Sequence, residues 1–202
     1  TSTGMVINEI RLNPNQRSFA HVLSENGYKT AYIGKWHMYA NELGNHYDVK
    51  NSYIPAGPDR LGFEYFAGYN FHHEYQDVYY HLDSPEKIVI PGYEPDGQAK
   101  LCMEKIEEYH NSGKPFAVFL SMGTPHDPWE KWNTPEDCYD LFEDTEFSLP
   151  PNYLPENDPH ADAWARLSDE ERSHLTDWMR CYYAMVANLD KNVGRVADKI
   201  KQ

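Results

Sequence analysis

The chain has 202 residues, of which 18 are Lys or Arg and 32 are Asp or Glu, so its formal net charge at pH 7 is −14. Such an acidic chain lacks the basic face that nucleic acid or an anionic membrane surface requires, which excludes both as expected partners. The sequence also has no run of 18 apolar residues, so we expect no membrane-spanning helix.

The length is sufficient for one domain with a buried core. Sixteen Tyr, five Trp and ten His suit either a polar cleft that stacks on sugars or an aromatic core with histidines on the surface, and composition leaves both readings open. The three cysteines show no metal-ligand spacing and no disulfide framework. No signal peptide is visible at the polar amino-terminal end, which we read as a chain cut from a longer protein.

The first predicted elements are a helix and a short strand. Apolar residues at helical spacing predict a helix over residues 16–25, and Gly27 stands just past its end. An apolar strand is predicted for residues 30–34. Residues 38–95 have many Gly, Pro, Tyr and His and little periodicity, so we expect a long site-forming loop there, with a short strand at residues 88–90.

A second helix and a second strand are predicted next. Asp96 is placed to cap a helix that runs to about Asn111, and Gly113 follows its end. Its buried stripe is expected to contain three residues: Cys102, Ile106 and Tyr109. Residues 116–121 form a nearly continuous apolar run, which is typical of a strand buried on both faces of a parallel sheet.

The last third of the chain is predicted to be a loop followed by a long helix. Residues 127–165 are acidic and rich in proline, which indicates a surface or site-forming loop. Ser168 and Glu171 then form a capping box, and a 3-4 apolar rhythm predicts one amphipathic helix over residues 168–201. The apolar positions of this rhythm are Leu175, Trp178, Met179, Tyr182, Val186, Leu189, Val193, Val196 and Ile200.

This alternation of helices and strands predicts an α/β fold with a mainly parallel sheet flanked by helices. Two predicted strands are too few for a stable sheet. We therefore expect strands from outside residues 1–202, or from a second copy in a homo-oligomer, to complete the sheet and cover its edges.

Two predicted strand ends carry groups suited to catalysis. Lys35 and His37 follow the first strand and His126 follows the second. If the strands are parallel, these ends open on the same edge of the sheet, where α/β folds place their ligands. A lysine offers a point charge to an oxyanion, and a histidine can shuttle a proton at neutral pH. On spacing alone, a solvated surface lysine is as good a reading of Lys35 as a ligand-binding one, and a structural role is favoured for His37 and His126 taken singly.

A second group of polar residues lies in the predicted 38–95 loop. His72, His73 and Glu74, with His81, could form a transition-metal site or line a sugar pocket. Adjacent histidines point poorly at one ion, so we assign no metal ligand here and favour the sugar pocket.

Four segments of the chain resemble the type I sulfatases of the alkaline phosphatase superfamily. Residues 27–37, G-Y-K-T-A-Y-I-G-K-W-H, resemble the family signature G-Y-x-T-x-x-x-G-K-W-H. Residues 114–128 resemble the family's K-P-F segment followed by P-H-x-P. Residues 61–68 are similar to its G-F-D-x-F-x-G segment, and residues 183–195 to the helix before its last metal-binding strand. The four segments occur in the family's order.

The resemblance implies a function and roles for three residues. It implies an incomplete sulfatase core, with residues 1–202 as the central part of one catalytic domain that cleaves sulfate from a sulfated carbohydrate or another small sulfate ester. Lys35 would bind a sulfate oxygen, His37 would hydrogen-bond the hydroxyl of a formylglycine nucleophile, and His126 would contact the sulfate and the bridging oxygen as general acid. The family is secreted or periplasmic in bacteria and lysosomal in animals.

Two parts of the family site have no counterpart in these residues. The formylglycine is made from the cysteine of C-x-P/A-x-R, and none of Cys102, Cys138 and Cys181 begins that motif. The Asp-Asp and Asp-Asn pairs that hold the family's Ca²⁺ through oxygen atoms are also absent. We therefore expect the nucleophile and the calcium ligands outside residues 1–202, and expect these residues alone to be inactive.

Two other functions stay open at this point. A phosphodiesterase or phosphonate hydrolase of the same superfamily would use similar strand ends, although the Trp36 and Pro-His-Asp-Pro segments favour a sulfatase. A non-catalytic homologue that binds sulfated glycans without cleaving them is the third reading.

Overall fold

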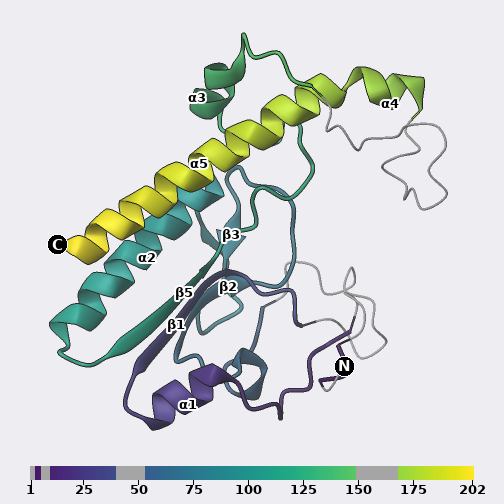
Figure 1. Ribbon diagram of the computed structural model, residues 1–202. Helices are drawn as coiled ribbons and strands as arrows, with labels where there is room; N and C mark the ends of the chain where they lie inside the picture. Colours follow the sequence, from purple (N-terminus) through teal and green to yellow (C-terminus); the bar gives the residue numbers. More distant parts are fainter. Residues whose placement is uncertain (1–2, 6–9, 40–52, 149–167) are drawn as a thin grey trace. The chain divides into compact units, whose positions relative to one another are not determined.

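The computed structural model describes four stretches of the chain: residues 3–5, 10–39, 53–148 and 168–202. Parts of the two predicted loops, 38–95 and 127–165, lie outside these stretches. Figure 1 shows the order of the helices and strands along the chain.

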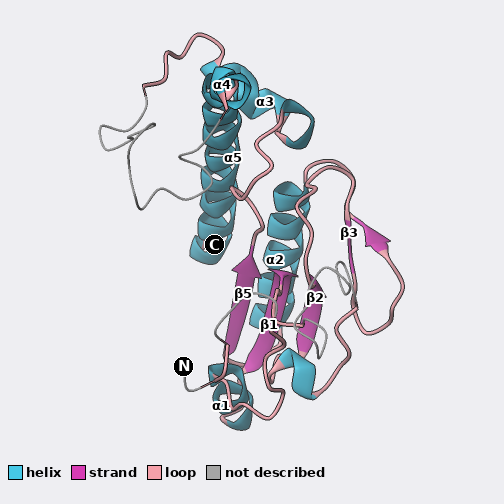
Figure 2. Ribbon diagram, turned by 90° about the vertical axis from the view of Figure 1, so that its right-hand side faces the viewer, coloured by secondary structure: helices cyan, strands magenta, loops and turns pink. Residues whose placement is uncertain are grey.

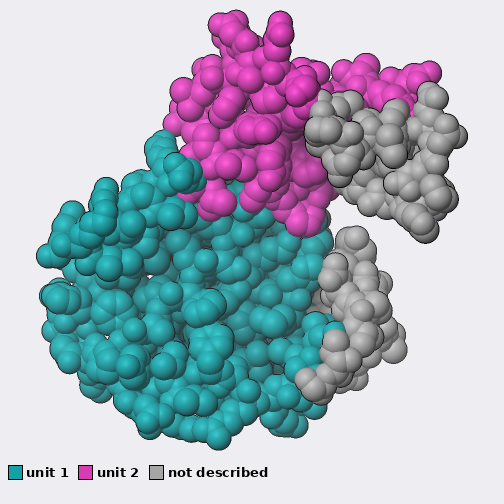
Figure 3. Space-filling view, in the orientation of Figure 1, with its two compact units in different colours: residues 1–124, 190–202 teal, residues 125–189 magenta. Residues whose placement is uncertain are grey.

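The chain divides into two compact units, coloured separately in Figure 3. The first contains residues 1–124 and 190–202, and the second contains residues 125–189. The predicted sheet and the residues around Lys35 belong to the first unit, whereas His126 belongs to the second.

The first unit is built on a parallel three-stranded sheet. Strand β1 (Lys29–Lys35) lies between β2 (Tyr65–Tyr69) and β5 (Phe116–Ser121), as Figure 2 shows. Both pairings are parallel, which confirms the predicted α/β fold. Strand β2 was not predicted, because it lies inside the aperiodic segment 38–95. It supplies a third strand from within the chain, where we expected one only from outside or from a second copy.

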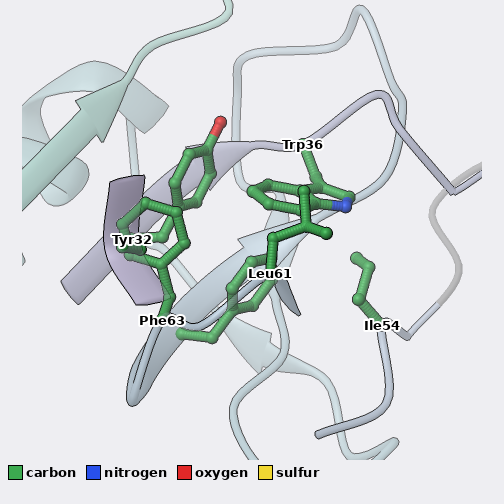
Figure 4. Packing of buried hydrophobic residues seen from close by; sticks show 7 residues of the cluster. Tyr32, Trp36, Ile54, Leu61 and Phe63 are labelled. Carbon is green, nitrogen blue, oxygen red and sulfur yellow. The ribbon is translucent and has the colours of Figure 1, made fainter. Parts of the chain in front are cut away.

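Helices cover both faces of this sheet because neighbouring residues of a strand point to opposite sides. On one face, Tyr32 packs with α1 (Phe19–Glu25) in an aromatic cluster drawn in Figure 4. This cluster contains Ala20, Tyr32, Trp36, Ile54, Leu61, Phe63 and Phe66. On the other face, Ile33 packs with Cys102 and Ile106 of α2 (Glu94–Asn111).

The two predicted strands differ in burial. The five central residues of β1 are all buried, as expected for a strand covered on both faces. Strand β5 is only half-buried, and Phe119 is 45% exposed. The prediction that residues 116–121 are buried on both faces is therefore wrong, because no residue of β5 is fully buried in the part of the chain that the structure describes, where β5 is an edge strand.

The helix starts follow local capping chemistry. Ser18 caps α1 and forms a capping box with His21, and Gly27 has a φ of +83° just beyond the helix end. Helix α2 begins at Glu94, so the prediction that Asp96 caps it is wrong. Pro95 suits the first helical turn because its φ is already helical and its missing N–H is not needed there. The predicted buried stripe of α2 is confirmed.

The segment between β2 and α2 is held by one buried guanidinium. It contains the antiparallel pair β3 (Tyr79–Tyr80) and β4 (Ile88–Val89), which confirms the predicted strand at 88–90. Arg60, in the short 3₁₀ helix η2 (Pro58–Arg60), is 2% exposed. Its guanidinium donates to the carbonyls of Ile54 and Leu82 at 3.0 and 2.7 Å, which ties the segment to the residues that precede β2.

The second unit contains short helices within the predicted 127–165 loop. They are η3 (Lys131–Asn133), α3 (Glu136–Tyr139) and η4 (Asp140–Phe142). Arg180 donates to the carbonyls of Phe142 and Glu143 at 3.0 and 3.2 Å, which attaches them to the following helix.

The single helix predicted over 168–201 is two helices. The capping box of Ser168 and Glu171 begins α4 (Asp169–Ser173), and α5 (Leu175–Lys201) starts after a break at His174. The residues buried along α5 are Cys181, Ala184, Met185, Asn188 and Asn192. Val193 and Ile200, which belong to the predicted apolar rhythm, are exposed. No helix in the described part of the chain is long and apolar enough to cross a membrane.

Candidate functional site

The candidate site begins where β1 and β2 end together. Lys35 and Tyr69 are register partners at the carboxyl ends of these parallel strands. The two chains continue side by side, because Trp36 N–H donates to the Tyr69 carbonyl and His37 N–H to the Asn70 carbonyl, both at 2.8 Å. Side chains from two distant segments therefore meet at the edge where α/β sheets bind ligands.

Lys35 is positioned by three neighbours. Its Nζ lies 3.3 Å from Nε2 of His73 and 4.9 Å from the centre of the Phe71 ring. The Tyr32 hydroxyl donates to the Lys35 carbonyl and holds the backbone. The ammonium is thus directed by an aromatic face and an imidazole at the sheet edge.

His37 is held in an unusual backbone conformation. Its φ is +53°, in the left-handed region, which costs a non-glycine residue about 1–2 kcal/mol. Its ring centre lies 4.7 Å from that of Phe71, and its Nε2 is buried. Strain of this kind persists where surrounding contacts enforce it and is concentrated at functional sites.

The structure brings two of the three predicted site residues together. Lys35 and His37 both contact the ring of Phe71 in the first unit. His126 lies in the second unit, where its side chain is 49% exposed. Its Nδ1 lies 2.6 Å from Oδ1 of Asp127, which orients the imidazole.

Sequence reasoning did not identify Phe71 and His73 as neighbours of Lys35. It grouped His73 with His72 and His81, yet His81 Nδ1 instead lies 2.9 Å from the Glu86 carbonyl oxygen. In the described part of the chain these histidines form no group that could hold a metal ion together. One feature of the sequence could have separated His72 from His73: consecutive residues of an extended chain point to opposite sides.

A buried polar layer lies behind this edge. The Glu94 carboxylate is fully buried, and its oxygens lie 3.1 Å from the Tyr69 hydroxyl and 3.1 Å from Nε2 of His72. Burial first, and then the Glu94 charge, raises the pKa of Tyr69 well above its usual value. Tyr69 therefore stays protonated and donates to the carboxylate, as a buried charge requires.

The chemistry of the donor set at the sheet edge favours an anion. Lys35 and His37 offer an ammonium and an imidazole nitrogen, which can donate to an oxyanion, and the His73 imidazole lies beside the ammonium. A hard cation such as Ca²⁺ takes oxygen ligands, which these three side chains do not offer.

Comparison with protein-family models identifies one family over the whole chain. The model described as Sulfatase matches residues 1–202. An ulvan-active sulfatase of Formosa agariphila is 27% identical over 194 residues, which cover 96% of this chain and 33% of that protein. An N-acetylglucosamine-6-O-sulfatase of Bacteroides thetaiotaomicron is 27% identical over 180 residues, covering 87% of this chain and 28% of that protein. The chain thus spans about a third of the length of these curated relatives.

Solved structures share the fold. A sulfatase candidate from Bacteroides fragilis matches with a TM-score of 0.73 and 25% identity, covering 95% of this chain and 41% of that one. A second structure, solved in complex with its substrate D-glucosamine-2-N,6-O-disulfate, matches with a TM-score of 0.69 and 19% identity. This match covers 99% of this chain and 49% of the other, and it supports the fold alone.

Proposed function

Because this chain belongs to the sulfatase family of the alkaline phosphatase superfamily, we propose that the protein carrying it hydrolyses sulfate esters of carbohydrates. The observation that carries the proposal is the Lys35 ammonium at the carboxyl end of β1, beside the His73 imidazole and in contact with the same Phe71 ring as His37. The two curated relatives described above are named for ulvan and for N-acetylglucosamine sulfate, which supports a sulfated sugar as substrate.

Lys35 is proposed to bind and stabilise the sulfate. When the bond between sulfur and the carbohydrate oxygen breaks, negative charge develops in the transition state. An ammonium that is already fixed beside the sulfate stabilises that charge without having to reorient. The contacts to Phe71 and His73 supply this fixation. Lys29, in the same strand, pairs with Glu64 instead and provides the control variant for the test below.

The two predicted histidines are proposed to handle protons. His37 would hydrogen-bond the nucleophile. Its left-handed backbone supports this role, because the surrounding structure holds the imidazole in a position that a non-glycine residue does not favour by itself. His126 would protonate the leaving sugar oxygen as general acid, with Asp127 orienting its ring.

The remaining parts of the site are proposed to come from the protein outside residues 1–202. A formylglycine would supply the hydroxyl that attacks sulfur, and a Ca²⁺ held by carboxylate and amide oxygens would neutralise the sulfate. The nitrogen donors found here do not suit Ca²⁺, and none of the three cysteines begins the formylglycine motif. Residues 1–202 would therefore be inactive by themselves.

The test is sulfate release by the whole protein from ulvan oligosaccharides and N-acetylglucosamine 6-sulfate, compared with N-acetylglucosamine 6-phosphate. We expect release from a sulfated sugar, and expect Lys35→Met to lower kcat/KM by at least about 100-fold. Lys29→Met is the matched control, since Lys29 begins the same strand and pairs with Glu64 at 3.0 Å. Faster cleavage of the phosphate ester, or binding without cleavage, would contradict the proposal.

A further inference from the structure

The side chains of Lys35 and His73 are within hydrogen-bonding distance of each other. An ammonium has three donors and no acceptor, so the 3.3 Å contact from Lys35 Nζ to His73 Nε2 is a hydrogen bond only if that nitrogen is unprotonated. A neutral His73 with its proton on Nδ1 is the form that accepts this hydrogen bond. A neutral imidazole beside the lysine acts as an acceptor and adds no second positive charge.

To bind an oxyanion well, the Lys35 side chain must be held in one position. The lysine side chain has a flexible four-carbon stem and loses roughly 2 kcal/mol of rotamer entropy when fixed. Phe71 and His73 lie around the Lys35 ammonium, and their own rings lie 4.5 Å apart. One proton of the ammonium is directed to His73, which fixes the position of the charge at the sheet edge.

The segment that carries His73 is anchored from the other side. His72 points into the buried layer, where its ring centre lies 3.6 Å from that of Tyr69 and its Nε2 lies 3.1 Å from Glu94. At the far end, the Tyr75 hydroxyl donates to the Gly123 carbonyl at 3.3 Å, and the Tyr75 carbonyl accepts from Glu94 N–H at 2.8 Å. The chain between these anchors has little freedom to move His73 away from Lys35.

We propose that His73 is a positioning residue for Lys35: neutral His73 accepts a hydrogen bond from the ammonium and holds the positive charge in the place where it meets the sulfate. This inference rests on the proposed function of Lys35, and it assigns a role to a residue outside the motifs that identified the family. His73 acts through Lys35 and needs no contact with the substrate.

The test compares His73→Gln with His73→Ala in the whole protein. The Gln side-chain oxygen can accept the same hydrogen bond, so kcat/KM should stay within about threefold of wild type. His73→Ala removes the acceptor and should lower kcat/KM by about 10–100-fold, mainly through kcat. His110→Ala, which changes an exposed histidine at the end of α2, is the matched control and should keep wild-type kinetics.

Each outcome decides between roles. Wild-type rates in His73→Ala would overturn the proposal, and so would equal losses in both variants, because a histidine that binds sulfate directly is not replaced by glutamine. If His73→Ala does not fold, ¹⁵N NMR of the wild-type imidazole decides instead. The Nδ1–H tautomer is expected, and a doubly protonated or Nε2–H ring overturns the proposal.

Failure of the proposed function is separable from failure of this inference. If the wild-type protein cleaves no sulfate ester, the proposed function fails, and the inference is then judged by binding of inorganic sulfate in calorimetry. Weaker binding in His73→Ala with recovery in His73→Gln would support the positioning role. Equal binding in all three proteins would overturn it.

Discussion

Gly34 in β1 faces the backbone of Ser121 in β5 so closely that a β-carbon on Gly34 would lie 2.1 Å from the Ser121 carbonyl oxygen. The two residues are register partners, and Gly34 has a φ of +110°. Only glycine fits both the conformation and the space. This close approach explains the glycine that immediately precedes Lys35.

Replacing Gly34 by alanine should therefore destabilise the sheet edge that carries Lys35. The obstructing atom is backbone and cannot rotate away, so we expect Gly34→Ala to cost at least about 2 kcal/mol in chemical denaturation. Gly27→Ala is the matched control, because Gly27 also has a positive φ but no atom within 4 Å of the added carbon. It should cost about 1 kcal/mol, and equal effects would contradict the steric argument.

Replacing His37 by asparagine should separate stability from catalysis. Asparagine tolerates the left-handed conformation, so the free energy of unfolding should stay within about 1 kcal/mol of wild type. The proton-handling imidazole is lost, so kcat/KM for sulfate release should fall by at least about 100-fold. His37→Val, with a β-branched side chain at positive φ, should instead destabilise the fold. Full activity in His37→Asn would remove the catalytic role.

Replacing Tyr32 by phenylalanine should reduce the sensitivity of the fold to alkaline pH. Burial raises the pKa of Tyr32 from 10.0 to about 12. Because the folded pKa is raised, the stabilisation is complete below pH 10 and is lost as pH rises towards 12. We expect a shallower fall of unfolding free energy with pH in Tyr32→Phe, and at pH 8 a loss of about 1 kcal/mol from the hydrogen bond to Lys35.

Denaturation between pH 8 and pH 11 measures this effect. Tyr28→Phe is the control for removing a phenol, since Tyr28 is exposed and lies next to the same strand. If the unfolding free energy falls equally with pH in wild type and Tyr32→Phe, ionisation of Tyr32 does not contribute to alkaline unfolding.

Replacing Arg60 by methionine should loosen the segment between β2 and α2. The change leaves the carbonyls of Ile54 and Leu82 without their donor in a buried place, which we expect to cost about 2–4 kcal/mol. Arg17→Met removes an exposed ion pair with Glu25 and should change stability by less than about 0.5 kcal/mol. Chemical denaturation of both variants measures the two losses of stability, and a loss as small in Arg60→Met as in Arg17→Met would contradict the prediction.

Replacing His126 by glutamine should affect poor leaving groups most. A general acid matters when the departing oxygen is basic, as in a sugar, and little when it is the anion of an acidic phenol. We expect kcat/KM to fall about 100-fold or more for a sugar sulfate but less than about tenfold for 4-nitrophenyl sulfate. Asp127→Asn should give a smaller loss with the same dependence. Equal losses on both substrates would show that His126 binds sulfate and does not donate a proton.

Local patterns predicted the elements whose causes are local. The apolar runs of β1 and β5, the helix end at Gly27 and the capping box of Ser168 were read correctly because each depends on neighbours in sequence. Strand β2 was missed because its five residues are defined by pairing with β1 and carry no alternating pattern of their own. The start of α2 was misplaced because both Asp96 and the true first turn are acceptable local choices.

The sequence by itself determined the α/β class through the alternation of predicted helices and strands, and the family through four short segments. One of these segments, directly after a buried strand, also gave the two candidate groups Lys35 and His37. Only the tertiary structure decided that Phe71 and His73 belong beside them. Those residues stand more than thirty positions away, and they reach Lys35 because β2 pairs in parallel with β1 and ends at the same edge. Contacts between distant segments depend on strand pairing and packing, which no local pattern encodes.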